Sequence, residues 1–140
     1  MNKLTPFHLA IPVDNIPICR KFYREVIGCE EGRSSDHWVD FNLFGHQLVI
    51  HYKEKPNDET HTNSVDGKNV PVPHFGVVLE WDTFHKFSDE LTKKGVDFVI
   101  EPYIRFKGKA GEQATMFFMD PSRNALEFKS FKNFDQIFVK

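Results

Sequence analysis

Regular alternation of apolar and polar residues predicts a strand and then a helix at the start of the chain. In residues 7–13 every second side chain is apolar, which is typical of a half-buried strand. A helix is expected from about Asp14 or Asn15, either of which can cap it, to Ile27, with Gly28 as its left-handed stop. Its apolar stripe is formed by Ile18, Phe22, Tyr23, Val26 and Ile27.

Two further strands and a polar linker are expected next. Residues 37–43 and 47–52 have the alternation of strands and flank a turn at 44–46. Residues 54–72 are polar, punctuated by proline and glycine, and aperiodic. We expect this segment to link two halves of the chain.

After the linker the order of elements begins again. Residues 73–81 alternate as a strand, a helix capped by Asp82 stops at Gly95, and residues 96–100 predict a short strand. The apolar stripe of the helix is formed by Phe84, Phe87 and Leu91. A loop is expected over about 102–112.

The closing segment, residues 113–131, predicts two strands joined by a tight turn. In this turn Pro121 presets φ, and Asp120 and Asn124 can bond nearby backbone groups. After the turn, Glu127 stands on the face opposite the large apolar residues. A carboxylate in the middle of an apolar strand needs a partner, since an unpaired buried charge is costly. We expect that partner to be a metal ion.

The two halves share one plan: a strand that carries a histidine, a helix that ends at a glycine, and then further strands. Such a repeat means that neither half can bury its apolar face alone, so the halves must pair. We therefore predict an α+β fold made of two paired βαβββ modules, whose curved mixed sheets form a metal-binding cleft. A single domain would span residues 1–140, with modules at about 4–53 and 73–131 and a tail at 132–140.

The strand faces turned away from the predicted helices carry His8, His51, His74 and Glu127. If the two sheets face each other, these side chains line the cleft. Two histidines and one carboxylate suit Fe(II), Mn(II), Zn(II) or Ni(II) and leave positions open for substrate. We favour His8, His74 and Glu127 as ligands, with His51 as a fourth ligand or a nearby acid or base. A single histidine on a strand is more often an ordinary polar residue than a metal ligand. Only the repeat of a histidine in both halves favours a metal-binding role for these residues.

Composition and charge narrow the classes of partner. A formal net charge of −2, with both signs interspersed, gives no electrostatic footprint for nucleic acid or an anionic membrane. No apolar run approaches the roughly 20 residues of a membrane helix, and residues 1–6 lead into a strand rather than a signal sequence. The two cysteines, Cys19 and Cys29, fit a reducing compartment. We expect a soluble cytoplasmic protein that takes a small-molecule substrate.

The chain resembles the vicinal oxygen chelate superfamily over about residues 5–131. The resemblance rests on Phe-His-Leu-Ala-Ile-Pro-Val at 7–13, Pro-His-Phe-Gly-Val at 73–77 and Met-Asp-Pro-Ser-Arg-Asn-Ala-Leu-Glu-Phe at 119–128. That superfamily includes glyoxalase I, extradiol ring-cleaving dioxygenases and fosfomycin or bleomycin resistance proteins. Within it, the chain looks most like stand-alone bacterial proteins described as extradiol-type dioxygenases, because of Phe-Val-Ile-Glu-Pro-Tyr-Ile-Arg-Phe-Lys-Gly at 98–108.

The resemblance implies an iron site formed by His8, His74 and Glu127. In glyoxalase-like members the last strand of the first module supplies a carboxylate ligand, and His51 stands at that position here, which disfavours a glyoxalase. Ring-cleaving members carry a tyrosine shortly before the last ligand, where this chain has Met-Phe-Phe at 116–118. Tyr103 and His51 are the candidate catalytic substitutes for it.

The function predicted from the sequence is a metal-dependent enzyme for a small substrate with vicinal oxygens, with catechol-like ring cleavage favoured. Arg105, Lys107 and Gln113 are candidate contacts for a substrate carboxylate or phenolate, although solvated surface charge is the commoner role of such side chains. The alternatives are a non-catalytic small-molecule binding protein of the antibiotic-resistance type and a glyoxalase-like lyase or isomerase. Because modules of this superfamily pair within or between chains, we also expect a homodimer.

Overall fold

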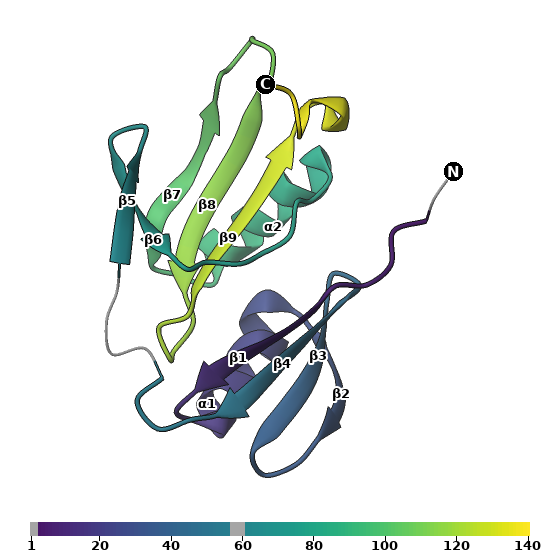
Figure 1. Ribbon diagram of the computed structural model, residues 1–140, viewed down its shortest axis with the longest axis vertical. Coiled ribbons are helices and arrows are strands. Elements are labelled where there is room, and N and C mark those ends of the chain that lie inside the picture. The colour runs from purple at the N-terminus through teal and green to yellow at the C-terminus, as the bar shows by residue number, and fades with distance from the viewer. Residues whose placement is uncertain (1–2, 57–60) are drawn as a thin grey trace. The chain divides into compact units, whose positions relative to one another are not determined.

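The computed structural model describes residues 3–56 and 61–140 (Figure 1). The chain divides into two compact units. Unit 1 comprises Met1–Glu59 and Asp120–Asn124, and unit 2 comprises Thr60–Met119 and Ala125–Lys140. Each unit contains a β-sheet and a helix, which confirms the predicted α+β class.

Unit 1 is built on a four-stranded sheet in the order β1-β4-β3-β2. The strands are β1 (His8–Val13), β2 (Glu30–Ser34), β3 (Trp38–Leu43) and β4 (His46–Tyr52). β1 pairs with β4 in parallel, whereas the other pairings are antiparallel. The sequence did not predict β2, because this exposed edge strand reads Glu-Glu-Gly-Arg-Ser and has no apolar alternation.

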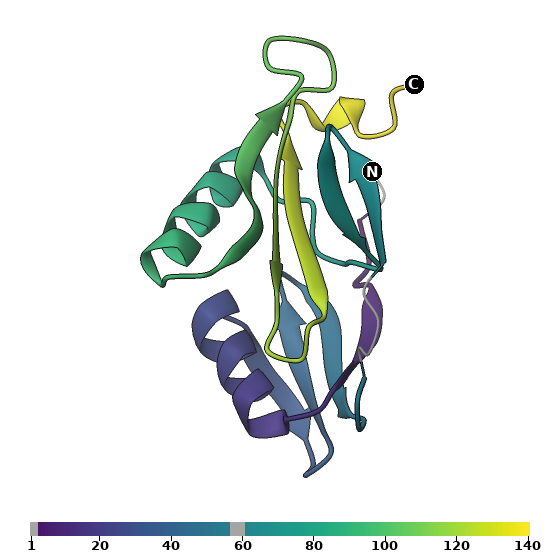
Figure 2. The ribbon, with the colours of Figure 1, turned by 90° about the vertical axis from the view of Figure 1, so that its left-hand side faces the viewer.

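The helical segment of unit 1 covers one face of this sheet (Figure 2). It begins as α1 (Ile16–Lys21) and continues as the π-helix η1 (Phe22–Ile27). Asn15 caps it, accepting a hydrogen bond from the backbone N–H of Ile18, and Gly28 ends it with a φ of 89°. The cap and the stop were both predicted.

The apolar stripe of this helix differs from the predicted one. Ile18 is 54% exposed, whereas Ile16, Cys19, Tyr23 and Ile27 are buried. These four positions are spaced three or four residues apart and therefore form one face, whereas Ile18 lies on the opposite, exposed side.

Unit 2 contains a three-stranded antiparallel sheet in the order β7-β8-β9. The strands are β7 (Phe98–Arg105), β8 (Gln113–Met119) and β9 (Ala125–Phe131). The closing hairpin is confirmed. β7 runs on to Arg105 through part of the predicted loop, because two register shifts let the pairing with β8 continue past Pro102.

The predicted strand at 73–81 is not formed, and two isolated bridges, at Phe75 and Val78, take its place. Residues 75–79 lie parallel to β9, with the backbone N–H of Phe75 donating to Ala125 and that of Leu79 donating to Lys129. The next helix, α2 (Trp81–Lys93), has Glu80 at its N-cap, so the predicted cap at Asp82 is wrong. Asp82 instead lies in the first turn, where its negative charge interacts favourably with the positive end of the helix dipole.

Helix α2 and a β-hairpin lie on opposite faces of the unit 2 sheet (Figure 2). The predicted stripe of Phe84, Phe87 and Leu91 is buried, and the ring of Phe87 packs edge-on against Phe128 with centroids 5.0 Å apart. The hairpin consists of β5 (His61–Val65) and β6 (Lys68–Val72), and its Val70 packs with Ile100 and Phe117 on the other face.

The β5–β6 hairpin occupies most of the segment predicted as a linker, of which residues 57–60 lie outside the described residues. Asp66 and Gly67 join its strands with φ values of 52° and 73°, as a two-residue hairpin turn of this kind requires. β5 is exposed and almost free of apolar side chains. Periodicity therefore gave no signal, and the Asp-Gly pair was the sign of a hairpin in the sequence.

The turn between β8 and β9 belongs to unit 1. Its Asp120 carboxylate accepts hydrogen bonds from the backbone N–H groups of Ser122 and Asn124, from the Asn124 amide and from the Tyr23 hydroxyl. Burial raises the pKa of Tyr23 well above its ordinary value, so the hydroxyl remains a donor. Asn124 also donates to the carbonyl of Pro12 in β1. The turn is therefore a polar part of the unit 1 interior.

Beyond β9, the short helix η2 (Phe134–Gln136) lies in the C-terminal tail. Within the described ranges, no helix combines the length and the apolar character needed to cross a membrane.

Candidate metal and substrate site

Unit 2 contains a cavity of about 130 Å³ on the sheet face away from α2. Its apolar wall is formed by Val65 and Val70 of the hairpin and Phe117 of β8. Its polar wall is formed by His74, Tyr103, Arg105, Thr115, Glu127 and Lys129. The structure therefore brings four of the predicted site residues to one cavity: His74, Tyr103, Arg105 and Glu127.

His74 is held in one tautomer by the backbone. Its Nδ1 lies 2.7 Å from the carbonyl oxygen of Pro71, which can only accept, so the neutral imidazole carries its proton on Nδ1. The Nε2 lone pair is then free. A hydrogen bond from one ring nitrogen to a carbonyl is also the usual support of a metal-ligating histidine.

The free nitrogen of His74 and the Glu127 carboxylate are neighbours. Nε2 lies 3.9 Å from Oε1 of Glu127, which is too long for a hydrogen bond. Ligand atoms of a Zn- or Fe-like ion lie about 2.1 Å from it, so two ligands of one ion can be at most about 4.2 Å apart. The pair lies below this limit but is longer than the roughly 3.4 Å of a tetrahedral ligand pair, so a small shift of one side chain would bring both atoms onto a single divalent ion.

The third predicted ligand, His8, belongs to unit 1. Its Nδ1 lies 2.8 Å from the side-chain oxygen of Gln47, the residue that it faces across the parallel pair of β1 and β4. With that oxygen as acceptor, the Nε2 of His8 is also left with a free lone pair. Among the described residues, no three His, Cys, Asp or Glu side chains are grouped closely enough to hold a metal. The placement of His8 beside His74 and Glu127 stays a prediction.

The two predicted catalytic residues are in different units. His51 is exposed near the end of β4 in unit 1, opposite Trp38 in the strand register. Tyr103 lines the unit 2 cavity, and its hydroxyl donates to Asp66 over 3.2 Å. Burial, followed by the nearby Asp66 charge, raises the pKa of Tyr103, so this phenol is a proton donor at neutral pH and not a base.

Arg105 is bound to the same carboxylate. Its Nε lies 2.5 Å from Oδ2 of Asp66 and its Nη2 lies 3.4 Å from Oδ1. The buried Nε makes this ion pair without an aligned hydrogen bond. Lys68 also lies over the Tyr103 ring, 4.9 Å from its centroid. The ion pair and the cation–π contact therefore hold the hairpin turn over the cavity.

The remaining predicted substrate contacts do not line the cavity. Lys107 is exposed in the turn after β7. Gln113 is buried, and its amide donates to the carbonyl of Gly111 over 3.3 Å. Asp66 and Thr115 were not among the predicted site residues, because Asp66 lay in the predicted linker and Thr115 in an apolar strand.

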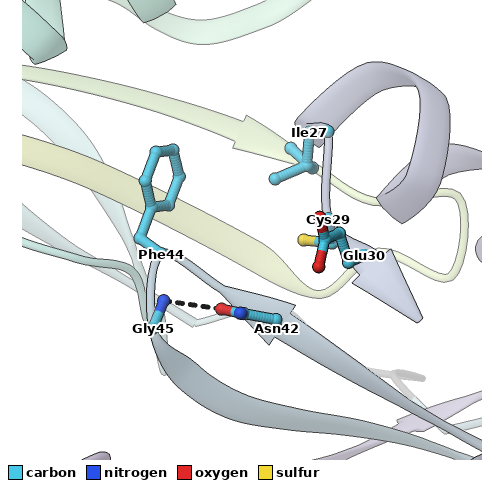
Figure 3. Close-up of a pocket in the computed structure, with 7 residues that line it drawn as sticks. Ile27, Cys29, Glu30, Asn42, Phe44 and Gly45 are labelled. Carbon is cyan, nitrogen blue, oxygen red and sulfur yellow. Dashed lines mark hydrogen bonds between the residues drawn. The ribbon is translucent and has the colours of Figure 1, made fainter. Parts of the chain in front are cut away.

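A separate pocket of about 340 Å³ lies in unit 1 between the end of η1 and the β3–β4 turn (Figure 3). Asn42 crosses the turn and accepts a hydrogen bond from the backbone of Gly45 over 2.7 Å. Burial raises the pKa of Cys29 in its wall to about 12, so the thiol stays protonated and unreactive. This pocket includes none of the predicted site residues.

A comparison with protein-family models identifies the family to which the chain belongs. The model of the glyoxalase/bleomycin resistance protein/dioxygenase superfamily matches residues 5–128. The chain belongs to this superfamily. The matched range includes His8, His74 and Glu127, and their role as metal ligands stays a prediction. A comparison with curated proteins gives no match.

Solved structures of the superfamily share the fold over nearly the whole chain. A glyoxalase/bleomycin resistance protein/dioxygenase from Alicyclobacillus acidocaldarius is 28% identical, with a TM-score of 0.80, over 95% of this chain and 96% of that one. A fosfomycin resistance protein from Listeria monocytogenes is 15% identical, with a TM-score of 0.61, over 93% of each chain. A lactoylglutathione lyase from Agrobacterium tumefaciens is 13% identical, with a TM-score of 0.62, over 93% and 94%. The last two show the common fold alone.

Proposed function

We propose that this member of the superfamily is a metal-dependent enzyme that acts on a small substrate with vicinal oxygens, with catechol-like ring cleavage as the favoured reaction. The observation that carries the proposal is the pairing of His74 and Glu127. One imidazole with a fixed tautomer and one carboxylate lie 3.9 Å apart at the wall of a cavity. His8, whose Nδ1 has a similar oxygen partner, is the proposed third ligand.

Two histidines and one carboxylate favour Fe(II), with Mn, Zn or Ni as the other candidates. The bound ion would act as a Lewis acid for the vicinal oxygens of the substrate. Tyr103 would keep its proton and donate a hydrogen bond to the substrate from the cavity wall, because its raised pKa holds the phenol in the protonated form. His51 remains the proposed base, since an imidazole exchanges protons near neutrality.

The setting of the reaction is also part of the proposal. Cys19 and Cys29 are free and buried, which is compatible with a reducing cytoplasm. We expect a homodimer, in which the two copies could share the ligand set. The oligomeric state in solution, measured by light scattering with and without added metal, tests this expectation.

The deciding experiment is the metal content of protein purified without oxygen and without chelator. Elemental analysis of the wild type should find about one divalent ion per site, because three protein ligands with neutral imidazoles suffice to hold one. His74→Ala and Glu127→Ala should lose it. Glu101→Ala, which removes an exposed carboxylate from β7, is the matched control and should keep it.

Each outcome decides between functions. Metal in the wild type and its loss in both ligand variants would justify assays of catechols with oxygen and then of hemithioacetals without it. No metal in the wild type, and none after reconstitution, would contradict the enzyme proposal. A small-molecule binding protein would then be the better explanation if ligand binding survives chelation.

A further inference from the structure

Asp66 occupies the position that an acidic group of a ligand would take. It reaches from the hairpin turn to the Arg105 guanidinium and the Tyr103 hydroxyl, and both of these residues line the cavity. Arginine is well suited to grip a carboxylate with two nitrogens at once. Here Nε lies 2.5 Å from Oδ2 without an aligned hydrogen bond, and the Nη2 contact is long, at 3.4 Å. The internal carboxylate therefore uses this site incompletely.

The cavity has a second polar group with unused capacity. The hydroxyl oxygen of Thr115 is buried and has no hydrogen-bond partner within the described part of the chain. Thr115 is only 4% exposed and lines the cavity. Buried polar groups are nearly always hydrogen-bonded, so an unpartnered hydroxyl at a cavity wall points to an oxygen or nitrogen atom of a ligand.

The charges of the residues that line the cavity balance only when Asp66 is counted with them; Lys68, over the Tyr103 ring, is not one of the lining residues. Arg105 and Lys129 are the cations that line it, and Glu127 is the lining anion. With Asp66 the sum is two positive and two negative charges, and without it one positive charge is left over. A ligand that replaces Asp66 must therefore bring one negative charge, because an unpaired cation in a partly buried site is costly.

The volume limits the size of the ligand. About 130 Å³ is close to the engineered cavity of about 150 Å³ that accepts benzene. A single ring, or a chain of similar bulk, fits such a space. The apolar side chains of Val65, Val70 and Phe117 would contact its hydrocarbon part.

We propose that the substrate of this site carries a carboxylate in addition to its vicinal oxygens, is no larger than one ring, and binds Arg105 in exchange for Asp66. The inference rests on the proposed function for the vicinal oxygens and the metal. The carboxylate subsite itself involves only residues of unit 2. Asp66 is then a built-in competitor that holds the hairpin over the cavity until the substrate anion replaces it.

The exchange predicts opposite effects for the two partners of one ion pair. Asp66→Asn and Arg105→Gln both break the same contact, so a purely structural role would give both variants similar behaviour. In the exchange, Asp66→Asn removes the competitor and strengthens anion binding, whereas Arg105→Gln removes the site and weakens it. Because exposed ion pairs are worth up to about 1 kcal/mol, each effect should amount to at most about fivefold in Kd.

The test is titration of the full chain with benzoate by calorimetry, in EDTA so that the result does not depend on metal. Benzamide is the neutral control of the same shape, and 2-naphthoate is the anion of larger size. The proposal expects benzoate to bind Asp66→Asn more tightly and Arg105→Gln more weakly than the wild type. Benzamide affinity should not change between variants, and 2-naphthoate should bind more weakly than benzoate in all three proteins.

Three results would overturn the inference: equal shifts of both variants in the same direction, equal affinity for benzoate and benzamide, or no binding of benzoate to Asp66→Asn. If Arg105→Gln does not fold, Arg105→Lys replaces it and should also weaken benzoate binding, because lysine cannot grip a carboxylate with two nitrogens. Metal content is measured separately on the same proteins. If the protein binds metal but the benzoate test fails, only this inference is overturned. If the benzoate test succeeds but the protein binds no metal, only the proposed function is overturned.

Discussion

The backbone of Gly76 lies so close to Glu127 that a Cβ at position 76 would be 1.5 Å from the Glu127 carbonyl oxygen. This close approach accompanies the parallel hydrogen bonds that join residues 75–79 to β9. Gly76→Ala should therefore force the two segments apart and lower the free energy of unfolding by about 2–3 kcal/mol. Urea denaturation followed by circular dichroism measures the change.

The matched control for this variant is Gly32→Ala in β2. There an added Cβ would meet the Asp40 side chain at 3.3 Å instead of a backbone oxygen. A small shift of that side chain relieves the contact, so the loss should be below about 1 kcal/mol. Equal losses in the two variants would show that the contact between Gly76 and Glu127 is not tight in solution.

The buried hydrogen bond between Tyr23 and Asp120 should contribute measurably to stability. Its O–O distance is 2.8 Å, and both side chains are buried. Tyr23→Phe should cost about 1–3 kcal/mol, since the acceptor is a carboxylate. Asp120→Asn should cost more, because an amide nitrogen would face other donors. A double-mutant cycle of the two changes gives the coupling free energy between the side chains. Strictly additive losses would contradict a stabilising hydrogen bond between Tyr23 and Asp120.

The ion pair between Arg20 and Glu31 predicts a pH dependence in unit 1. Two contacts of 2.7 Å to Arg20 lower the pKa of Glu31 below its ordinary value of 4.5. A carboxyl with a lowered pKa adds stability above its unfolded pKa, and this is lost as the pH falls through its folded pKa. Glu31→Gln should thus cost at most about 1 kcal/mol at pH 7, since the pair is partly exposed.

That cost should shrink below pH 4.5 and disappear in stronger acid, where both proteins carry a neutral group at this position. Thermal unfolding of both proteins from pH 7 to pH 3 measures it. The matched control is Glu30→Gln, which changes the neighbouring exposed glutamate on β2. A cost for Glu31→Gln that stays constant over this range would exclude a charge effect.

Both thiols of the native protein should be unreactive. Burial raises the pKa of Cys19 to about 11 and that of Cys29 to about 12, so almost no thiolate is present at pH 8. Ellman's reagent should label neither within minutes under native conditions and both in urea. Rapid labelling of either thiol in the folded protein would contradict the burial that the structure shows.

Sequence patterns found most of the fold because most elements have one buried face. β1, β3 and the middle of β9 bury alternate side chains, and the burial shows as period two. β4 and β8 instead bury unbroken runs of side chains, which stand out as apolar stretches in the sequence. β2 and β5 are exposed and polar, and their hydrogen bonds to neighbouring strands leave no trace in hydropathy. Tertiary pairing, and not local sequence, makes them strands.

Some residues of the candidate site could be predicted from the sequence, and others could not. Glu127 was selected as a carboxylate in the middle of an apolar strand, and His74 because both halves carry a histidine at a corresponding place. The structure places the two side chains 3.9 Å apart. Asp66 could not be found in the same way, because its role depends on a hairpin that has no counterpart in the first half. Thr115 could not be recognised from the sequence, because threonine is common in strands. Only the structure shows that its buried hydroxyl has no hydrogen-bond partner among the described residues.

The five residues Asp120–Asn124 belong to unit 1, although 60 residues of unit 2 separate them from the rest of it along the chain. During synthesis the ribosome releases Tyr23 long before its acceptor Asp120 exists. The N-terminal half cannot complete its interior as it emerges, since its hydroxyl donor must wait for nearly the whole polypeptide. A gene fragment that ends after codon 59 would encode an unfinished unit, because the residues Asp120–Asn124 that complete unit 1 would be missing.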